Sequence, residues 1–138
     1  MSHQLNILIG RLGADPEMRY TPSGQAVTNF PVATNRKYNN ANGEEVKETC
    51  GFKISAWGKL GEVCNTYLHK GSQVYIEGRL VPDPATGNPR IWNRQDGSPA
   101  ASYEIHADVV RFLDSKNGNG NGNGEQPAPA GEEPEIPF

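Results

Sequence analysis

Three short segments of the sequence place aromatic side chains beside cations. They are "NRKY" with Arg36, Lys37 and Tyr38, "GFKISAWGK" with Phe52, Lys53, Trp57 and Lys59, and "PRIWNR" with Arg90, Trp92 and Arg94. Cations pair with phosphates, and flat rings stack on bases whatever the base sequence. Because each stacked base contributes about 1–3 kcal/mol, the three segments together favour binding of single-stranded nucleic acid.

Each aromatic residue also has a purely structural interpretation. Trp57 ends a predicted strand and could equally pack in the core, and the same holds for Phe52, whose strand parity matches two apolar neighbours. Tyr38 borders the polar loop "NNANGEE", where it could simply be solvated. Trp92 lies in a segment rich in Pro, Gly and Asn, where burial is less natural, so binding is favoured there.

No pattern in the sequence points to catalysis. His3, His69 and His106 lie in different predicted elements, and none has a Cys, Ser or acid pair at a spacing that builds a site. HExxH, GxSxG and clustered metal ligands are absent from the sequence. Cys50 and Cys64 are too few for a disulfide framework or a zinc site, so we expect reduced, partly buried thiols. We predict a protein that is not an enzyme, with no metal and no cofactor.

Strand patterns dominate residues 1–113. We predict strands over 5–10, 26–38, 46–57, 72–81 and 102–113, and a helix over 58–71, where Leu60, Val63, Cys64, Tyr67 and Leu68 form one apolar stripe. On this basis Tyr67 is a core residue and Gly71 a helix stop. Three strands, one helix and two strands are typical of the oligonucleotide/oligosaccharide-binding (OB) fold, an all-β, five-stranded Greek-key barrel with a short helix between strands 3 and 4. A β-sandwich seldom has a helix at that place.

The positions of Pro and Gly, and the alternation of apolar with polar residues, predict where these strands are irregular and which side chains share a face. Pro31 lacks an N–H, so it indicates a strand edge or bulge, and Gly51 indicates a bulge or bend. In strand 72–81, Val74, Ile76, Gly78 and Leu80 share one face. The dipeptide at 96–97, Asp-Gly, predicts a hairpin turn.

The composition changes after Leu113. Residues 1–113 carry 12 Lys and Arg against 11 Asp and Glu, whereas residues 114–138 carry one Lys against five acids, which together give the net charge of −3. We therefore predict a folded domain over 1–113, a flexible Gly/Asn/Pro/Ala-rich linker over 114–131 and an acidic tip over 132–138. The near-neutral domain excludes a uniformly basic nucleic-acid binder, although cations gathered locally would serve.

The tip combines acids with apolar residues, which is unusual for a chain end. It consists of Glu132, Glu133, Pro134, Glu135, Ile136, Pro137 and Phe138. A merely solubilising segment needs neither Ile136 nor Phe138, so we expect the tip to dock on a partner protein. The first residues do not resemble a signal peptide and no apolar stretch approaches the ~20 residues of a membrane helix, so we expect a soluble, cytoplasmic protein without a membrane partner.

Four segments in order resemble the bacterial single-stranded DNA-binding protein (SSB) family. They are "LIGRLGADPEMRYTPSGQAV", "WGKLGEV", "YLHKGSQVYIEGRL" and the final "IPF". The resemblance implies an OB barrel that assembles as a homotetramer, wraps single-stranded DNA during replication, recombination and repair, and lies in the bacterial cytoplasm with the nucleoid. It also implies a tail that recruits replication and repair proteins.

The resemblance further implies roles for individual residues. The stacking positions fall on Tyr38, Trp57 and Trp92, the cationic positions on Arg19, Lys53, Lys59 and Lys70, and the subunit contacts on Tyr75 and Glu77. A tryptophan common in the family falls on Gly51 here, and Phe52 beside it could compensate only from the other sheet face. Two alternatives remain: an RNA-binding barrel of the cold-shock or translation-factor kind, and a protein-interaction module that presents the tail.

Overall fold

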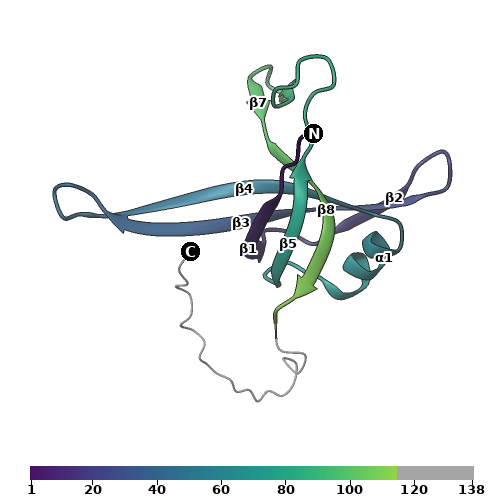
Figure 1. Cartoon of the computed structure of the whole chain (residues 1–138), viewed down its shortest axis with the longest axis horizontal. Helices are drawn as coiled ribbons and strands as arrows, with labels where there is room; N and C mark the ends of the chain where they lie inside the picture. The colour runs from purple at the N-terminus through teal and green to yellow at the C-terminus, as the bar shows by residue number, and fades with distance from the viewer. Residues whose placement is uncertain (115–138) are drawn as a thin grey trace.

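The computed structural model describes residues 1–114, and these residues form eight strands and one helix (Figure 1). The elements are β1 (Asn6–Leu12), β2 (Glu17–Tyr20), β3 (Ala26–Asn39), β4 (Glu45–Trp57), α1 (Gly58–Tyr67), β5 (Gln73–Leu80), β6 (Ile91–Asn93), β7 (Pro99–Ala101) and β8 (Tyr103–Phe112). Apart from Asp114, the linker and tip expected over 114–138 lie outside the described residues.

Five of the strands close into a barrel. The sheet order β1-β5-β8-β4-β3 is completed by pairing of β1 with β3, and β2 adds to the edge of β3. This is the five-stranded OB barrel with one helix between its third and fourth strands that the sequence predicts, so the fold class is confirmed. Gly10 makes the closure possible, because a Cβ there would lie 2.3 Å from the carbonyl oxygen of Ala33 on the crossing strand.

The irregular positions of the sheet differ in part from those expected. Pro31 lies between the part of β3 that pairs with β2 and the part that pairs with β1, so its missing N–H costs no ladder bond, as expected of an edge. The bulge expected at Gly51 is wrong, because β3 and β4 pair without interruption from Val27 opposite Trp57 onward. The register shift lies instead at Gly78, in the β5–β8 pair.

The core fills the barrel with alternating apolar side chains. Phe30, Ile54, Ile76 and Ile105 are almost completely buried. The hydroxyl of Thr28, itself buried, donates to the carbonyl oxygen of Gly61 at 2.6 Å and so fastens α1 to the barrel. Cys64 and Leu68 complete the contact from the helix side.

Two residues expected in the core are on the surface. Tyr67 is 66% exposed, because it is the last residue of α1, and its ring lies beside that of Phe112 with centroids 6.1 Å apart. Leu80 is 41% exposed, because it is the last residue of β5, where the chain leaves the barrel. Gly71 lies three residues beyond the helix C-cap and takes a φ of 92°, so it shapes the turn into β5 rather than the helix end.

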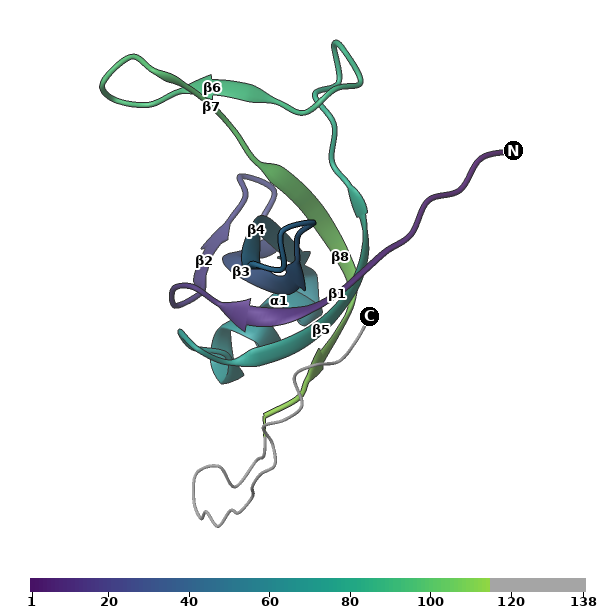
Figure 2. The ribbon, with the colours of Figure 1, turned by 90° about the vertical axis from the view of Figure 1, so that its left-hand side faces the viewer.

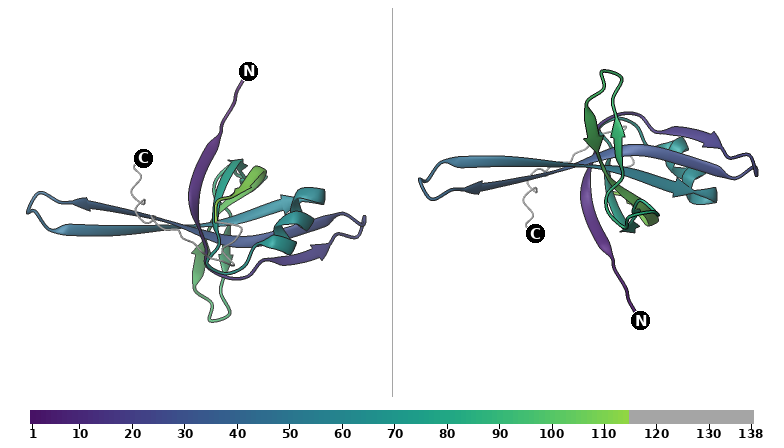
Figure 3. Two further views of the ribbon diagram at one scale, coloured as in Figure 1. Left: turned by 90° about the horizontal axis from the view of Figure 1, so that it is seen from below. Right: turned by 90° about the horizontal axis from the view of Figure 1, so that it is seen from above.

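Besides the short β2–β3 hairpin, two hairpins project from the barrel (Figures 1 and 3). The outer halves of β3 and β4 form one long arm that reaches away from the barrel. The β6–β7 hairpin stands at one end of the barrel, and its turn contains the Asp96–Gly97 pair that the sequence singles out, with Gly97 at a φ of 89°. The arm carries Tyr38, the β6–β7 hairpin carries Trp92, and β2 carries Tyr20, so all three parts present aromatic residues beyond the barrel wall.

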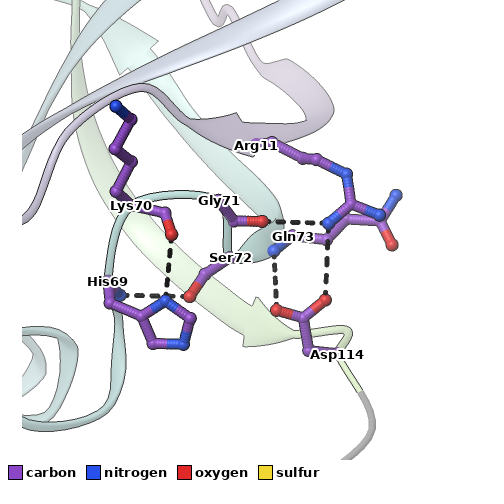
Figure 4. A network of polar contacts seen from close by, with 7 residues as sticks. All are labelled: Arg11, His69, Lys70, Gly71, Ser72, Gln73 and Asp114. Atoms are coloured by element: carbon purple, nitrogen blue, oxygen red, sulfur yellow. Dashed lines mark hydrogen bonds and ion pairs between the residues drawn. The ribbon is translucent and has the colours of Figure 1, made fainter. Parts of the chain in front are cut away.

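A polar network joins the end of β8 to the turn before β5 (Figure 4). Arg11 donates to the carbonyl oxygen of Gly71 at 2.9 Å and pairs with Asp114 at 3.6 Å, while the N–H of Gln73 donates to Asp114 at 3.1 Å. Within residues 1–114, no helix is long and apolar enough to cross a membrane, and no three His, Cys, Asp or Glu side chains gather as metal ligands.

Candidate nucleic-acid interface

A groove runs between the barrel and the β6–β7 hairpin. It has a volume of about 820 Å³ and is bounded by the β1–β2 turn, by the faces of β3 and β4, and by the hairpin that overhangs them (Figure 2). Phe52, Lys53 and Trp92, three of the residues expected to bind DNA, line this groove together. Its volume is within the range of pockets that hold small organic groups.

Phe52 is both a core residue and a residue of the candidate interface, the two roles that the sequence leaves open for it. It is half-buried and packs against the core cluster, yet its ring also lines the groove. Tyr103 lies opposite Phe52 in the parallel β4–β8 register, with ring centroids 5.8 Å apart and planes tilted by 39°. Tyr103 cannot be identified from the sequence, because its alternation with Ile105 assigns it to the core, whereas as the first residue of β8 it is 55% exposed.

The arginines around Trp92 are engaged within the protein. Trp92 is 41% exposed, and the guanidinium of Arg94 lies 6.0 Å from its ring centroid while donating to the hydroxyl of Ser98 and to a backbone carbonyl of β7. Arg90 pairs with Glu104 of β8, and this hydrogen bond raises the pKa of Arg90 above its usual value. Arg90 therefore ties the hairpin to β8 and has its charge partly offset before any ligand binds, whereas Arg94 is bonded to neutral groups within the hairpin.

Trp57 lies on the surface, with part of its ring packed on the protein. It is 36% exposed, and its ring stacks on His106 with centroids 6.4 Å apart and planes 13° from parallel. Arg19 pairs with Val27, which in turn pairs with Trp57, so the cation and the ring lie on the same sheet face two strands apart. Lys59 follows in the first turn of α1 and is exposed. The sequence predicts no role for His106, and only its position across the sheet reveals the stack.

Tyr38 lies on the arm, far along β3. It is 39% exposed, and the guanidinium of Arg36 lies 4.5 Å from its ring centroid. Arg36 also pairs with Glu48 at 2.9 Å, and Lys37 pairs with Glu45 at 3.5 Å. Such exposed pairs add little stability and open readily when a stronger anion approaches, so both cations remain accessible to phosphates.

Lys70 lies in the turn before β5, close to one end of the groove. Its backbone N–H donates to Asp15 Oδ1 at 2.8 Å, and Asp15 lines the groove. The neighbouring His69 N–H donates to the hydroxyl of Ser72 at 3.0 Å, and the imidazole of His69 meets the Lys70 carbonyl (Figure 4). The turn is therefore held from both sides, which fixes the point from which the Lys70 side chain extends.

Tyr75 and Glu77 lie on the outer face of β5, as their alternation predicts. The Tyr75 hydroxyl donates to Glu77 at 2.6 Å, which raises the pKa of Tyr75. Directly across on β1, Ile9 faces Tyr75 and Ile7 faces Glu77, and these isoleucines are 36% and 56% exposed. This outward apolar pair is not predicted from the sequence, because Ile7, Leu8 and Ile9 form a continuous apolar run that does not show which of them face outward.

The residues expected to bind DNA thus fall into three regions rather than one cluster: the groove, the Trp57 face and the arm. Each region holds at least one exposed aromatic ring and at least one cation. The expected docking residues, from Glu132 to Phe138, lie outside the part of the chain that the structure describes.

Curated relatives with similar sequences carry one common description. The single-stranded DNA-binding protein of Neisseria meningitidis serogroup A is 42% identical over 117 residues, which cover 85% of this chain and 63% of the relative. That of Wolinella succinogenes is 37% identical over 110 residues, which cover 80% and 64%. The chain therefore spans about three fifths of the length of these relatives.

Solved structures agree with the sequence comparison. The Plasmodium falciparum SSB in complex with single-stranded DNA superimposes with a TM-score of 0.68 at 28% identity, over 83% of this chain and 97% of that one. A deletion mutant of the single-stranded DNA-binding protein from Thermus aquaticus gives 0.62 at 25% identity, over 82% and 51%. Residues 4–113 match the single-strand binding protein family, and the chain belongs to that family.

Proposed function

We propose that this protein binds single-stranded DNA with little sequence preference, catalyses no reaction, and protects the strand during replication, recombination and repair. The observation that carries the proposal is the distribution of exposed aromatic rings. Trp57, Trp92 and Tyr38 lie on three different parts of the surface, each with cations nearby. A strand that passed over all three would stack bases on each ring, which is tolerant of sequence because every base has a π-face.

Local cations supply the electrostatic part of the binding. The folded domain has a net charge near zero, so its overall field attracts DNA only weakly. Arg19, Lys53, Lys59 and Lys70 are exposed, and no ion pair of theirs is found among the described residues. These four neutralise phosphates, with Lys37, Arg90 and Arg94 as contributors that first loosen their internal pairs. Affinity then falls as salt rises, because each neutralised phosphate releases counterions.

The outer face of β1 and β5 supports a role in assembly, and we propose a homotetramer with Tyr75 and Glu77 at subunit contacts. Ile7 and Ile9 extend this face with exposed apolar surface that a second copy would bury. Replacing Ile7 with Asp places a charge at the centre of this face, and light scattering should then show a smaller assembly. An unchanged mass would place the subunit contacts elsewhere.

The proposed division of the chain assigns DNA binding to residues 1–113, a linker to 114–131 and partner recruitment to 132–138. Deleting 132–138 is expected to leave single-strand affinity essentially unchanged and to abolish capture of replication and repair proteins. Loss of DNA binding in this variant would contradict the division of roles. The proposal places the protein in the bacterial cytoplasm, on the nucleoid.

The test of the main proposal is a tryptophan-fluorescence titration with oligo-dT of graded length. Parallel titrations use duplex DNA, oligo-U and raised salt. Quenching by dT that saturates at lengths several times the ~4–16 nucleotides of one OB fold supports stacking on an assembled oligomer. Stronger binding of oligo-U would favour an RNA-binding barrel, which reads the 2′-hydroxyls. Absence of quenching by every single strand would favour a protein-interaction module.

A further inference from the structure

Aromatic rings from both the barrel and the hairpin meet at the groove. Tyr103 and Phe52 line it from β8 and β4, and Trp92 lines it from β6, in the hairpin that overhangs the barrel (Figure 2). Tyr103 is 55% exposed, and Phe52 is the one aromatic ring beside it among the described residues. A large ring left this exposed beside a groove has apolar surface available for a ligand.

The backbone of β4 beside the groove is unusually open. Gly51 borders the groove from the face of β4 opposite to Phe52, and a Cβ built on this glycine would meet no atom within 4 Å. Ala33, the cross-strand partner of Gly51, also lines the groove and adds only a methyl group. The bound strand can therefore pass close to the backbone of β3 and β4 at this point.

The charges of the groove favour a base over a phosphate. Asp15 and Glu17 lie along one side, while Lys53 is the one cation among the lining residues. Asp15 accepts a hydrogen bond from the backbone N–H of Lys70, which holds its carboxylate beside the groove. A phosphate inside the groove would face these carboxylates, whereas at the rim it can pair with Lys53.

We propose that this groove seats a single unstacked nucleobase of the bound strand, and that Tyr103 supplies a stacking ring there. Trp92 closes the seat from the hairpin side, while on the opposite face of β4 the open backbone at Gly51 lets the strand pass and Lys53 holds the adjoining phosphate. The proposal rests on the proposed single-strand binding and adds to it a position and a residue. Tyr103 acts by direct contact with the base, so its hydroxyl is dispensable and its ring is not.

The first experiment measures anisotropy of a fluorescein-labelled oligo-dT with wild type, Tyr103→Ala and Tyr103→Phe. Tyr103→Ala should weaken binding about fivefold or more, which is the lower end of the range for a lost base stack, and Tyr103→Phe should bind like wild type. Tyr67→Ala is the matched control, because Tyr67 is also an exposed tyrosine beside one other ring and does not line the groove. Its affinity should not change.

A second variant tests the path of the strand across the opposite face of β4. Gly51→Leu adds a side chain there without a clash at the Cβ, so the fold should melt at a similar temperature while the strand is held away from Lys53. In a Trp57→Phe background, Trp92 is the remaining indole, and its quenching by dT should shrink in both Tyr103→Ala and Gly51→Leu.

The outcomes separate the two proposals. If wild type binds dT and both Tyr103→Ala and Gly51→Leu bind it equally well, the base seat is overturned and single-strand binding stands. If wild type fails to bind any single strand, the proposed function is overturned and the seat with it. If Tyr103→Phe loses as much affinity as Tyr103→Ala, the contact is a hydrogen bond from the hydroxyl, and the stacking assignment is wrong.

Discussion

Replacing Trp57 and Trp92 together with Ala is the most direct challenge to the proposed binding mode. The two rings lie on different elements, one at the end of β4 and one in the β6–β7 hairpin. Both are more than a third exposed, and their ring neighbours, His106 and Arg94, belong to separate regions. Their contributions to binding should therefore add.

The magnitude follows from the number of stacked bases. Each lost stack costs about 1–3 kcal/mol, a range that comes from OB-fold proteins of this same kind. Two independent stacks then cost about 2–6 kcal/mol, or roughly a 30-fold to 10⁴-fold loss of affinity at about 1.4 kcal/mol per tenfold. The folded domain should lose little stability, because neither ring belongs to the buried core cluster.

The assay must not depend on the rings that are removed. Anisotropy of labelled oligo-dT at fixed salt gives the affinities of wild type, each single variant and the double variant, and thermal melting confirms that all four are folded. Tyr67→Ala serves as the aromatic control on a surface away from the groove. A folded double variant with less than a threefold loss would refute the stacking argument and leave these rings without a role in binding.

Three further predictions concern particular contacts. Gly61→Ala should lower the free energy of unfolding by about 1–3 kcal/mol in a denaturant titration, because its Cβ would lie 2.4 Å from a backbone carbonyl oxygen of β4; wild-type stability would show that α1 can shift freely. Burial raises the pKa of the Cys64 thiol from 9.0 to about 11. At pH 8 a thiol reagent should therefore label Cys50 quickly and Cys64 only after unfolding. The free energy of unfolding should fall as pH rises from 9 towards 11, because the thiol ionises first in the unfolded chain. His106→Val should change the emission of Trp57 in free protein whose other tryptophan is replaced by Phe, and identical spectra would contradict the stack.

Much of the barrel can be predicted from local pattern because its strands alternate clearly. In β5, the burial of Val74 and Ile76 and the partial exposure of Gln73, Tyr75 and Glu77 follow directly from the period of two. Pattern fails at the ends of elements. Tyr67 continues the apolar stripe of α1, and Leu80 continues the inner row of β5, yet both lie where the barrel no longer covers them.

The aromatic and cationic residues of the candidate interface could be identified as types but not as neighbours. "GFKISAWGK" and "PRIWNR" indicate Phe52 and Trp92 separately. That both line one groove depends on the β6–β7 hairpin folding back over β4, a contact between segments some forty positions apart. Tyr103 was missed for the same reason, because its exposure depends on where the barrel ends.

The sequence by itself determined the OB barrel, the position of its helix, the kinds of residue available for stacking and charge, and the change of composition after Leu113. The strands and the helix follow from the spacing of apolar residues, which recur about every two residues in a strand and every three to four in a helix. Only the tertiary structure decided which rings share a groove, which arginines are already paired, and that Trp57 stacks on His106. Those outcomes depend on cross-strand register and on hairpin placement, which are set by packing between distant segments and have no local signature.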